Sequence, residues 1–563
     1  MTALLLLAAL LFGAAPAQSA TYVPISGAGS TWSQNALDQW RANVKQYGMT
    51  VNYNGTGSSD GRNQFRNGTV DYGVSEIPYG IKDSGVVDPP PSRKYAYMPI
   101  VAGGTSFMYN LTIGNRRVTN LRLSGDVIAK IFTGQIRTWN DPAIKADNPA
   151  IASALPARRV VPVVRSDGSG TSAQFTTWMS KQYPSLWDAY CRRAGRGTPC
   201  GATSNYPLVP GGGFVAQSGS NGVSGYVAQG GNVGTITYVE YSYAVYTTGF
   251  PVAKVLNKGG YYVEPTAKNV AVSLLKARIN ENSSSPGYLT QILDDVYNDS
   301  DPRAYPLSSY SYMIIPTKLE SNFNAQKGKT LGAFAYYFLC QGQQRVDNLG
   351  YSPLPINLVQ AGLNQVRRIP GVDVERINIK DCHNPTFSSD GTNTLAKTAP
   401  YPPACDKKGA SQCSTGTGGA KTPTQVGGGS GGGGASGGGG GSGAGSGGSA
   451  SGGSGGSGKG GTSSGASGGS GGAGSGGASG TPAAAGGASI DPDTGQVIAA
   501  NGASADGAGA DAFAVPVNTS RSIGSGTRTV LMTLAGVLLL GVTVGPPLLS
   551  RRLKRGAPLG GQR

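Results

Sequence analysis

The sequence predicts an α/β fold, because short apolar runs are repeatedly followed by a Gly/Ser-rich turn and then by a stretch with helical spacing. The clearest case is residues 163–179, where an apolar run breaks into a polar turn at 166–172 before the helical pattern begins. Residues 26–44 and 49–67 show the same succession. Ligands of open α/β sheets bind at the carboxyl ends of the strands, beside helix N-termini. The three turns therefore predict one polar site at a sheet edge.

The turn at residues 165–171 has the chemistry of an anion site. The hydroxyls of Ser169 and Thr171 stand where N-cap residues stand, and Gly170 lets the backbone approach closely. The first N–H groups of a helix lack partners and carry its partial positive charge. Arg165, at the end of the strand, can reach the same point with a forked guanidinium. Alone, this could be an ordinary turn with a solvated arginine, but its recurrence favours a small oxyanion.

The N-terminus and the cysteines indicate an exported protein. Residues 1–20 form an apolar run that ends in small residues, which is typical of a secretory signal peptide. Six cysteines fit an oxidising compartment, and no Cys-x-x-Cys pair suggests a metal site. Fifteen disulfide connectivities are possible for six cysteines. Local spacing favours Cys191 with Cys200 and Cys405 with Cys413, which leaves Cys340 for Cys382.

The charge of the chain favours anionic ligands. The formal net charge is +17, and the basic residues are scattered through the folded part without a run. A scattered distribution argues against a nucleic-acid partner and favours anionic small ligands and the polyanionic cell envelope. The only histidine is His383, and no Gly-x-Ser-x-Gly turn follows a predicted strand in the folded part. The sequence therefore predicts a binding protein rather than an enzyme, with no cofactor and no metal.

Four segments in order resemble the signature segments of the periplasmic phosphate-binding proteins of ABC transporters. They are residues 27–32, 51–59, 71–76 and 165–172, and the resemblance extends from about residue 21 to about residue 370. It implies a two-lobed periplasmic-binding-protein fold of type II, with inorganic phosphate between the lobes and an ABC permease as partner. Site residues carried over position by position are Thr31, the backbone of Trp32, Ser58, Glu76, Arg165, Ser169, Gly170 and Thr171, with Asp167 orienting Arg165.

The resemblance also implies the domain boundaries. The binding domain covers residues 21–380, with one lobe at about 21–102 and 305–370 and the other at about 103–304. The hinge is expected near residues 101–105 and 301–306, so that closure of the lobes buries the anion.

Glu76 departs from the family, which usually has the shorter aspartate at this position. A carboxylate accepts hydrogen bonds only, so it tolerates an anion that still carries a proton and repels one that does not. Hydrogen phosphate can donate such a bond, whereas sulfate near neutral pH cannot. We expect Glu76 to decide the ligand preference of the site.

The C-terminal part departs from transport-coupled relatives. Residues 381–417 form a cysteine-containing extension, and residues 418–527 are a Gly/Ser-rich stretch with the composition of a disordered linker. Residues 529–550 carry no charge and are long enough to span a bilayer core of about 30 Å. The basic tail at 551–563 would lie inside. This predicts a single-pass protein of the cell membrane with an extracytoplasmic binding domain. The tether keeps open an alternative function, a phosphate sensor, scavenger or structural surface protein that is not coupled to transport.

Overall fold

The structure, a computed structural model, describes residues 22–425 except 81, 84–85, 286, 321 and 389–391, together with four residues near the C-terminus. The chain divides into two compact units, residues 1–438 and 439–563. In the second unit, β18 (Ser489–Ile490) pairs antiparallel with β19 (Val497–Ile498). The expected signal peptide (1–20), transmembrane segment (529–550) and basic tail (551–563), and most of the expected linker (418–527), lie outside the described residues.

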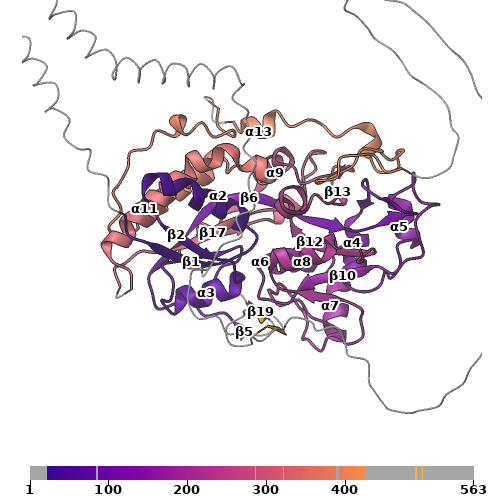
Figure 1. The fold of residues 1–563 in the computed structure, drawn as a ribbon, viewed down its shortest axis with the longest axis horizontal. Coiled ribbons are helices and arrows are strands. Elements are labelled where there is room, and N and C mark those ends of the chain that lie inside the picture. The colour runs from indigo at the N-terminus through magenta and orange to yellow at the C-terminus, as the bar shows by residue number, and fades with distance from the viewer. Residues whose placement is uncertain are drawn as a thin grey trace, which may run out of the picture. The chain divides into compact units, whose positions relative to one another are not determined.

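One eight-stranded sheet runs through the first unit and confirms the α/β prediction (Figure 1). Its strand order is β11-β10-β12-β6-β17-β3-β1-β2. β2, β1 and β3 are mutually parallel at one end, and β12, β10 and β11 are parallel at the other. The strands are β1 (Ile25–Gly29), β2 (Val51–Asn54), β3 (Tyr72–Ser75), β6 (Tyr95–Tyr109), β10 (Val161–Arg165), β11 (Val215–Gln217), β12 (Thr235–Glu240) and β17 (Ser308–Pro316).

Helices and small sheets surround this sheet. The helices are α2 (Gln34–Val44), α3 (Ser58–Arg66), α4 (Gly125–Phe132), α5 (Pro142–Asp147), α6 (Gly170–Gln182), α7 (Pro184–Arg193), α8 (Gly219–Ala228), α9 (Ala267–Ser273), α10 (Asp294–Tyr297), α11 (Ala325–Leu339), α12 (Ile356–Val366) and α13 (Thr394–Lys397). Tighter turns form η1 (Lys45–Tyr47), η3 (Leu274–Lys276), η4 (Gln341–Leu349), η5 (Ile379–Cys382) and η6 (Ala404–Asp406), and η2 (Tyr243–Thr248) is a π-helix. The short strands are β4 (Lys82–Asp83), β5 (Val86–Val87), β7 (Thr112–Ile113), β8 (Arg116–Arg117), β9 (Arg122–Leu123), β13 (Lys254–Leu256), β14 (Tyr262–Val263), β15 (Arg278–Ile279) and β16 (Gln291–Ile292).

The long strand β6 crosses between two lobes. Its first part pairs with β17 as far as Gly104, and its last part, from Thr105, pairs with β12. Buried apolar side chains form one core around β1, β2, β3, α2 and α11, and another around β10, β12, α4 and α6. Val270 and Leu274, which come from the segment expected in the second lobe, pack in the first core. The reason is that α9 lies against β6 and β17, beside the crossing.

Local sequence signals explain where several helices begin. Ser169 caps α6 by accepting a hydrogen bond from the N–H of Ser172 at 3.1 Å. Asp141 caps α5 in the same way, with Pro142 at the first helical position. At α3 the residue before the helix is Gly57, whose φ of 96° suits glycine. Of these helices, α3 follows the end of β2 and α6 follows the end of β10, so their first N–H groups lie at the sheet edge.

Residues 371–425 form a strap that runs over both lobes (Figure 1, orange). The strap is joined to the first lobe by the Cys340 to Cys382 disulfide and to the second by the ion pair of Lys254 with Asp406 at 2.5 Å. Between these points, α13 packs with α9. The other two disulfides join Cys191 to Cys200 and Cys405 to Cys413.

The strap continues into the expected linker. The N–H of Gly418 donates to Glu264 at 2.7 Å, and Thr424 Oγ1 donates to Asn120 Oδ1 at 2.5 Å. Residues 418–425 therefore belong to the folded part, because their backbone and hydroxyl groups find partners on the second lobe.

Candidate functional site

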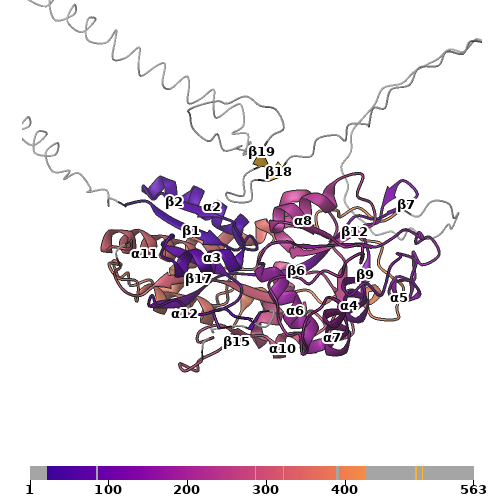
Figure 2. The same cartoon turned by 90° about the horizontal axis from the view of Figure 1, so that it is seen from below.

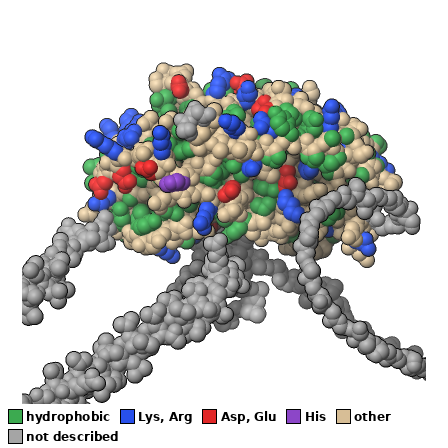
Figure 3. All heavy atoms as spheres, turned by 90° about the horizontal axis from the view of Figure 1, so that it is seen from above, with side chains coloured by type: hydrophobic (Ala, Val, Ile, Leu, Met, Phe, Trp, Pro, Cys, Tyr) green, Lys and Arg blue, Asp and Glu red, His purple; other side chains and the backbone are tan. Residues whose placement is uncertain are grey.

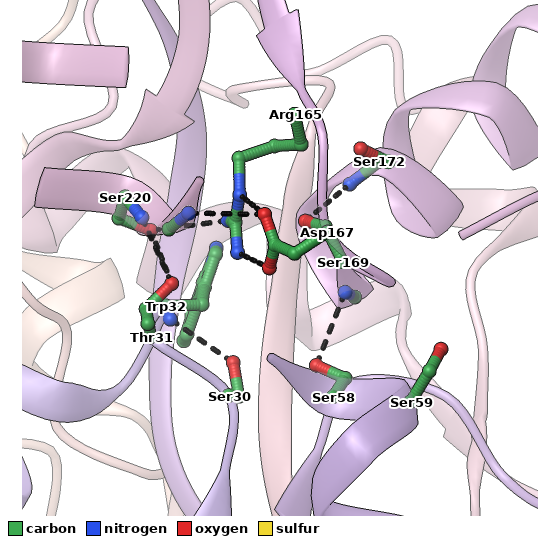
Figure 4. A network of polar contacts seen from close by, with 12 residues as sticks. Ser30, Thr31, Trp32, Ser58, Ser59, Arg165, Asp167, Ser169, Ser172 and Ser220 are labelled. Carbon is green, nitrogen blue, oxygen red and sulfur yellow. Dashed lines mark hydrogen bonds and ion pairs between the residues drawn. The ribbon is translucent and has the colours of Figure 1, made fainter. Parts of the chain in front are cut away.

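The candidate anion site lies where α3 of the first lobe adjoins α6 of the second lobe, and the two helices are neighbours in both Figure 1 and Figure 2. Parallel strands from each lobe end here, and the chain then turns into a helix. Figure 4 shows the side chains that gather at this place. The predicted residues that the structure brings together are Thr31, Trp32, Ser58, Glu76, Arg165, Asp167, Ser169, Gly170 and Thr171.

Arg165 supplies the positive charge of the site. It ends β10, is 3 % exposed, and donates from Nε to Asp167 Oδ1 at 2.6 Å. Its Nη2 donates to the other oxygen of Asp167, which gives a forked pair. Burial works to raise the pKa of Asp167, but the charge and hydrogen bonds of Arg165, with the N–H of Gly219, outweigh it and hold the pKa below its ordinary value. Asp167 thus remains ionised and holds the guanidinium in one orientation.

Neutral donors surround the guanidinium. Thr31 Oγ1 lies 2.9 Å from Ser220 Oγ, and Arg165 Nη1 donates to Ser220 Oγ at 3.4 Å. The N–H of Gly170, in the first turn of α6, donates to Ser58 Oγ at 3.1 Å. Thr171 Oγ1 is buried and has no hydrogen-bond partner among the described residues. A buried hydroxyl without a partner costs about 1–3 kcal/mol, so a ligand that accepted a hydrogen bond from Thr171 would remove that cost.

Glu76 is a fully buried carboxyl held by serine hydroxyls. Its Oε2 accepts from Ser30 at 2.7 Å and from Ser58 at 2.8 Å, and its Oε1 accepts from Ser311 at 2.7 Å. Burial raises the pKa of Glu76, and the three serines and the charge of Arg165 oppose that rise without cancelling it. The carboxyl therefore stays protonated to a higher pH than an ordinary glutamate does.

Position 170 requires glycine, because the Glu76 carboxyl and the Ser58 hydroxyl occupy the space that a side chain would need. A Cβ at position 170 would lie 2.0 Å from Glu76 Oε2 and 2.5 Å from Ser58 Oγ. The carboxyl of Glu76 therefore lies directly against the start of α6. A side chain at position 170 would displace the carboxyl from its serines.

Ser30, which lies in the first of the three predicted turns, donates to Glu76. Three further residues of this network were missed by the sequence reasoning: Ser311 donates to Glu76, Ser220 contacts Thr31, and Gln174 Nε2 donates to the backbone oxygen of Glu76 at 2.7 Å. Ser220 could have been found, because residues 217–222 are another Gly/Ser turn between a strand and a helix. Ser311 and Gln174 carry no such local signal.

Contacts between the lobes surround the site. The N–H of Ser59 donates to Gly168 O at 3.0 Å, and Ser59 Oγ donates to Ser204 Oγ at 3.0 Å.

The part of the chain that the structure describes holds no cluster of three or more His, Cys, Asp or Glu residues suited to a metal ion. Within that part, no helix combines the length and the apolar character needed to cross a membrane.

Comparison with known proteins defines the class first. Residues 14–341 match the model of the PBP superfamily domain, which covers more than half of the chain. A relative from Methanocaldococcus jannaschii named phosphate-binding protein PstS is 32 % identical over 359 residues, which are 61 % of this chain and 85 % of that protein. A protein of the same name from Xylella fastidiosa strain Temecula1 is 31 % identical over 345 residues, again 61 % of this chain and 85 % of the relative.

Among solved structures, a high-affinity periplasmic phosphate-binding protein bound with phosphate matches with a TM-score of 0.44 and 18 % identity, over 62 % of this chain and 99 % of that one. The chain belongs to the PBP superfamily and, within it, to the PstS family of phosphate-binding proteins.

Proposed function

We propose that this chain is a solute-binding protein that captures inorganic phosphate between its lobes and delivers it to an ABC phosphate importer. The observation that carries the proposal is the meeting of Arg165, the start of α6 and Glu76 at one buried place. The two relatives described above are named phosphate-binding proteins, and this chain shares their family. In this function the protein binds its ligand and performs no reaction on it.

The chemistry of the site suits an anion that still carries a proton. The guanidinium, the hydroxyls of Thr31, Ser169 and Thr171, and the helix N–H groups would donate to phosphate oxygens. The ionised carboxylate of Glu76 would accept the remaining phosphate proton, with a small rearrangement of the Ser58 hydroxyl. Sulfate has no such proton at neutral pH and would place two negative charges in contact. Leaving a buried charge opposed in this way costs several kcal/mol, or roughly a thousandfold in affinity.

Capture requires the lobes to separate and close again. The observed hydrogen bonds from Ser59 to Gly168 and Ser204 cross between the lobes beside the site. Hydrogen bonds of this kind are each worth about 1 kcal/mol net, because water replaces them on opening. A bound anion would add charged hydrogen bonds to both lobes, and so would favour the closed arrangement.

We also propose that residues 529–550 anchor the domain to the cell membrane, with the binding domain outside and residues 551–563 inside. The proposal rests on the uncharged composition of 529–550 and on the basic residues that follow it. If the anchored protein did not supply a permease, it would act as a surface sensor or scavenger. Phosphate uptake at limiting phosphate in a deletion strain separates the two functions, since only transport predicts reduced uptake.

The test of ligand identity is calorimetric titration of the full chain with phosphate and with sulfate, at pH 6 and pH 8. We expect micromolar or tighter phosphate binding and no sulfate binding at pH 8. Binding of neither anion, with phosphate binding recovered in Glu76→Asp, would show that the longer carboxylate has turned the fold to another ligand.

A further inference from the structure

A second groove lies on the outside of the first lobe, away from the anion site. It has a volume of about 600 Å³, which is within the usual range of about 300–1,000 Å³ for small-molecule sites. We call it the amide groove, because five of its lining residues are asparagine or glutamine. These five amide residues are Gln39, Asn43, Gln46, Gln341 and Gln344. None of them belongs to the anion site.

Three segments that are distant in sequence build the groove. One wall is α2 with η1, another is η4, and the rim is the start of the strap. The Cys340 to Cys382 disulfide holds that rim, and Gln344 Nε2 donates to Cys382 O at 2.9 Å. Asp381 and His383, on either side of Cys382, are thereby fixed at the groove. Figure 3 shows the face that carries the only histidine, in purple.

The floor of the groove is closely packed. The indole N–H of Trp40 donates to Gly342 O at 2.9 Å. A Cβ at position 342 would lie 2.8 Å from that indole nitrogen, so glycine allows η4 to approach α2. The ring of Trp40 stacks on Phe338 with centroids 5.2 Å apart. The walls are therefore held in place by the core beneath them.

The amides along the groove are already ordered by mutual hydrogen bonds. Gln39 Nε2 donates to Asn43 Oδ1 at 2.8 Å, and Asn43 Nδ2 donates to the hydroxyl of Tyr337 at 2.9 Å. Tyr47 donates to Gln341 Oε1 at 3.3 Å. An amide has two donor hydrogens and an acceptor oxygen with two lone pairs, so these bonds leave further donors and acceptors towards solvent. Such a surface complements groups that both donate and accept, and hydroxyl groups do both.

Aromatic rings and charge balance point to the same ligand chemistry. Tyr47 is 46 % exposed, and its ring centroid lies 6.1 Å from that of Tyr337. A tyrosine ring offers an apolar face beside a polar tip, which matches the C–H faces and hydroxyls of a sugar ring. The lining contains one arginine, Arg345, and one carboxylate, Asp381, so their formal charges cancel. A neutral ligand fits this balance better than phosphate does.

We propose that the amide groove binds a neutral saccharide, with Tyr47 as the stacking surface and Gln39, Asn43 and Gln341 as hydrogen-bonding partners. An uncharged peptide also donates and accepts hydrogen bonds. The groove, however, is lined by helical segments and offers no strand edge on which an extended peptide backbone could pair. The saccharide is therefore favoured.

The test is calorimetric titration of the full chain with linear oligosaccharides of N-acetylglucosamine, glucose and mannose, and separately with an uncharged tetrapeptide. The variants are Tyr47→Ala and Tyr47→Phe, and the matched control is Tyr246→Ala, a tyrosine that is 51 % exposed in the second lobe. We expect one oligosaccharide to saturate the native chain. Its binding should weaken at least about tenfold in Tyr47→Ala, which is about 1.4 kcal/mol, while Tyr47→Phe and Tyr246→Ala stay within about twofold.

Phosphate titration of each variant shows whether the fold is intact, and it should be unchanged. Saturation-transfer NMR should show that ring protons of the sugar contact the protein in the native chain and lose that contact in Tyr47→Ala. The proposal is overturned if no oligosaccharide saturates the native chain up to about 10 mM. It is equally overturned if Tyr47→Ala binds as well as the native chain, or if only the tetrapeptide binds.

Discussion

The contacts beside the anion site and the strap both join the two lobes, but they do so with different chemistry. Beside the anion site, Thr31 meets Ser220 and Ser59 meets Ser204 through hydroxyl groups. Along the strap, a disulfide holds the first lobe, and the ion pair of Lys254 with Asp406, whose side chain is 3 % exposed, holds the second. Hydroxyl contacts exchange readily with water, whereas a disulfide and a buried ion pair do not.

We therefore expect the hydroxyl contacts beside the anion site to break when the lobes separate, and the strap contacts to remain. Beside the crossing between the lobes, Arg303 Nη1 donates to Ala396 O at 3.2 Å, and its guanidinium lies over the ring of Tyr401 at 4.7 Å. The strap is therefore attached close to residues 301–306, where the hinge is expected and where a rotation would produce the smallest displacement. We expect the contacts beside the anion site to determine the phosphate affinity, and the strap contacts to determine the free energy of unfolding.

The largest effect is expected from Arg165→Ala. The variant removes the guanidinium of the forked pair and leaves Asp167 without its charged partner. Loss of one member of a buried charge pair costs about 2–5 kcal/mol, so phosphate affinity should fall by roughly 30-fold to several thousandfold. Calorimetry measures this directly. The control is Arg278→Ala, which breaks an exposed ion pair and should bind phosphate as the native chain does. Equal losses of phosphate affinity in the two variants would show that the ligand does not bind at Arg165.

Removing the strap disulfide should affect stability instead. The double variant Cys340→Ser with Cys382→Ser opens a loop with a sequence separation of 42, whereas the control Cys405→Ser with Cys413→Ser opens one of 8. Loop-closure entropy predicts losses of about 4 and about 2.5 kcal/mol in the free energy of unfolding. Denaturant titration measures both. Phosphate affinity in the first variant should stay within about threefold, and a tenfold loss would show that the strap also sets lobe closure.

Glu76 should make anion selectivity depend on pH. Burial raises the pKa of its carboxyl, although the serines and Arg165 oppose that rise. Above this raised pKa the carboxylate repels sulfate, and below it the neutral carboxyl can donate to sulfate. Competition by sulfate should therefore grow as the pH falls through the pKa of Glu76. In Glu76→Gln, sulfate should compete with phosphate even at pH 8. Its competition there should be about tenfold or more stronger than in the native chain.

The control for this experiment is Glu281→Gln, an exposed position, which should keep the native selectivity at every pH. Sulfate is titrated against bound phosphate from pH 5 to pH 8. If the ratio of sulfate affinity to phosphate affinity did not change with pH in the native chain, Glu76 would not be the group that sets the selectivity.

The smallest effect on phosphate affinity is expected at the hydroxyl contacts between the lobes beside the anion site. Ser220→Ala removes one neutral partner each of Thr31 and Arg165, so phosphate affinity should fall by about 1 kcal/mol, or roughly fivefold. Dissociation should become faster, while association changes little. Stopped-flow release of phosphate measures the dissociation rate. The control Ser180→Ala removes a hydroxyl that is half-buried in α6 and donates to Thr177 O, away from these contacts, and its phosphate affinity should match that of the native chain.

Local patterns in the sequence were enough for the α/β class and for the chemistry of the turn at residues 165–171. Arg165 and Asp167 are two residues apart, and the cap of α6 by Ser169 depends on neighbours only. The disulfide pairs suggested by spacing are the pairs in the structure. Composition gave no sign that Gly418 and Thr424 have hydrogen-bond partners on the second lobe, because those partners are far away in the sequence.

The amino-acid sequence alone determined the strand ends, the glycine-rich turns and the charged pair, because these depend on backbone conformation and on contacts between near neighbours. Only the tertiary structure decided that Ser311 donates to Glu76, that Ser220 meets Thr31, and that the strap completes the amide groove. Those contacts join residues that are distant along the chain. Likewise, the raised pKa of Glu76 arises because packing of the surrounding segments removes water from its carboxyl.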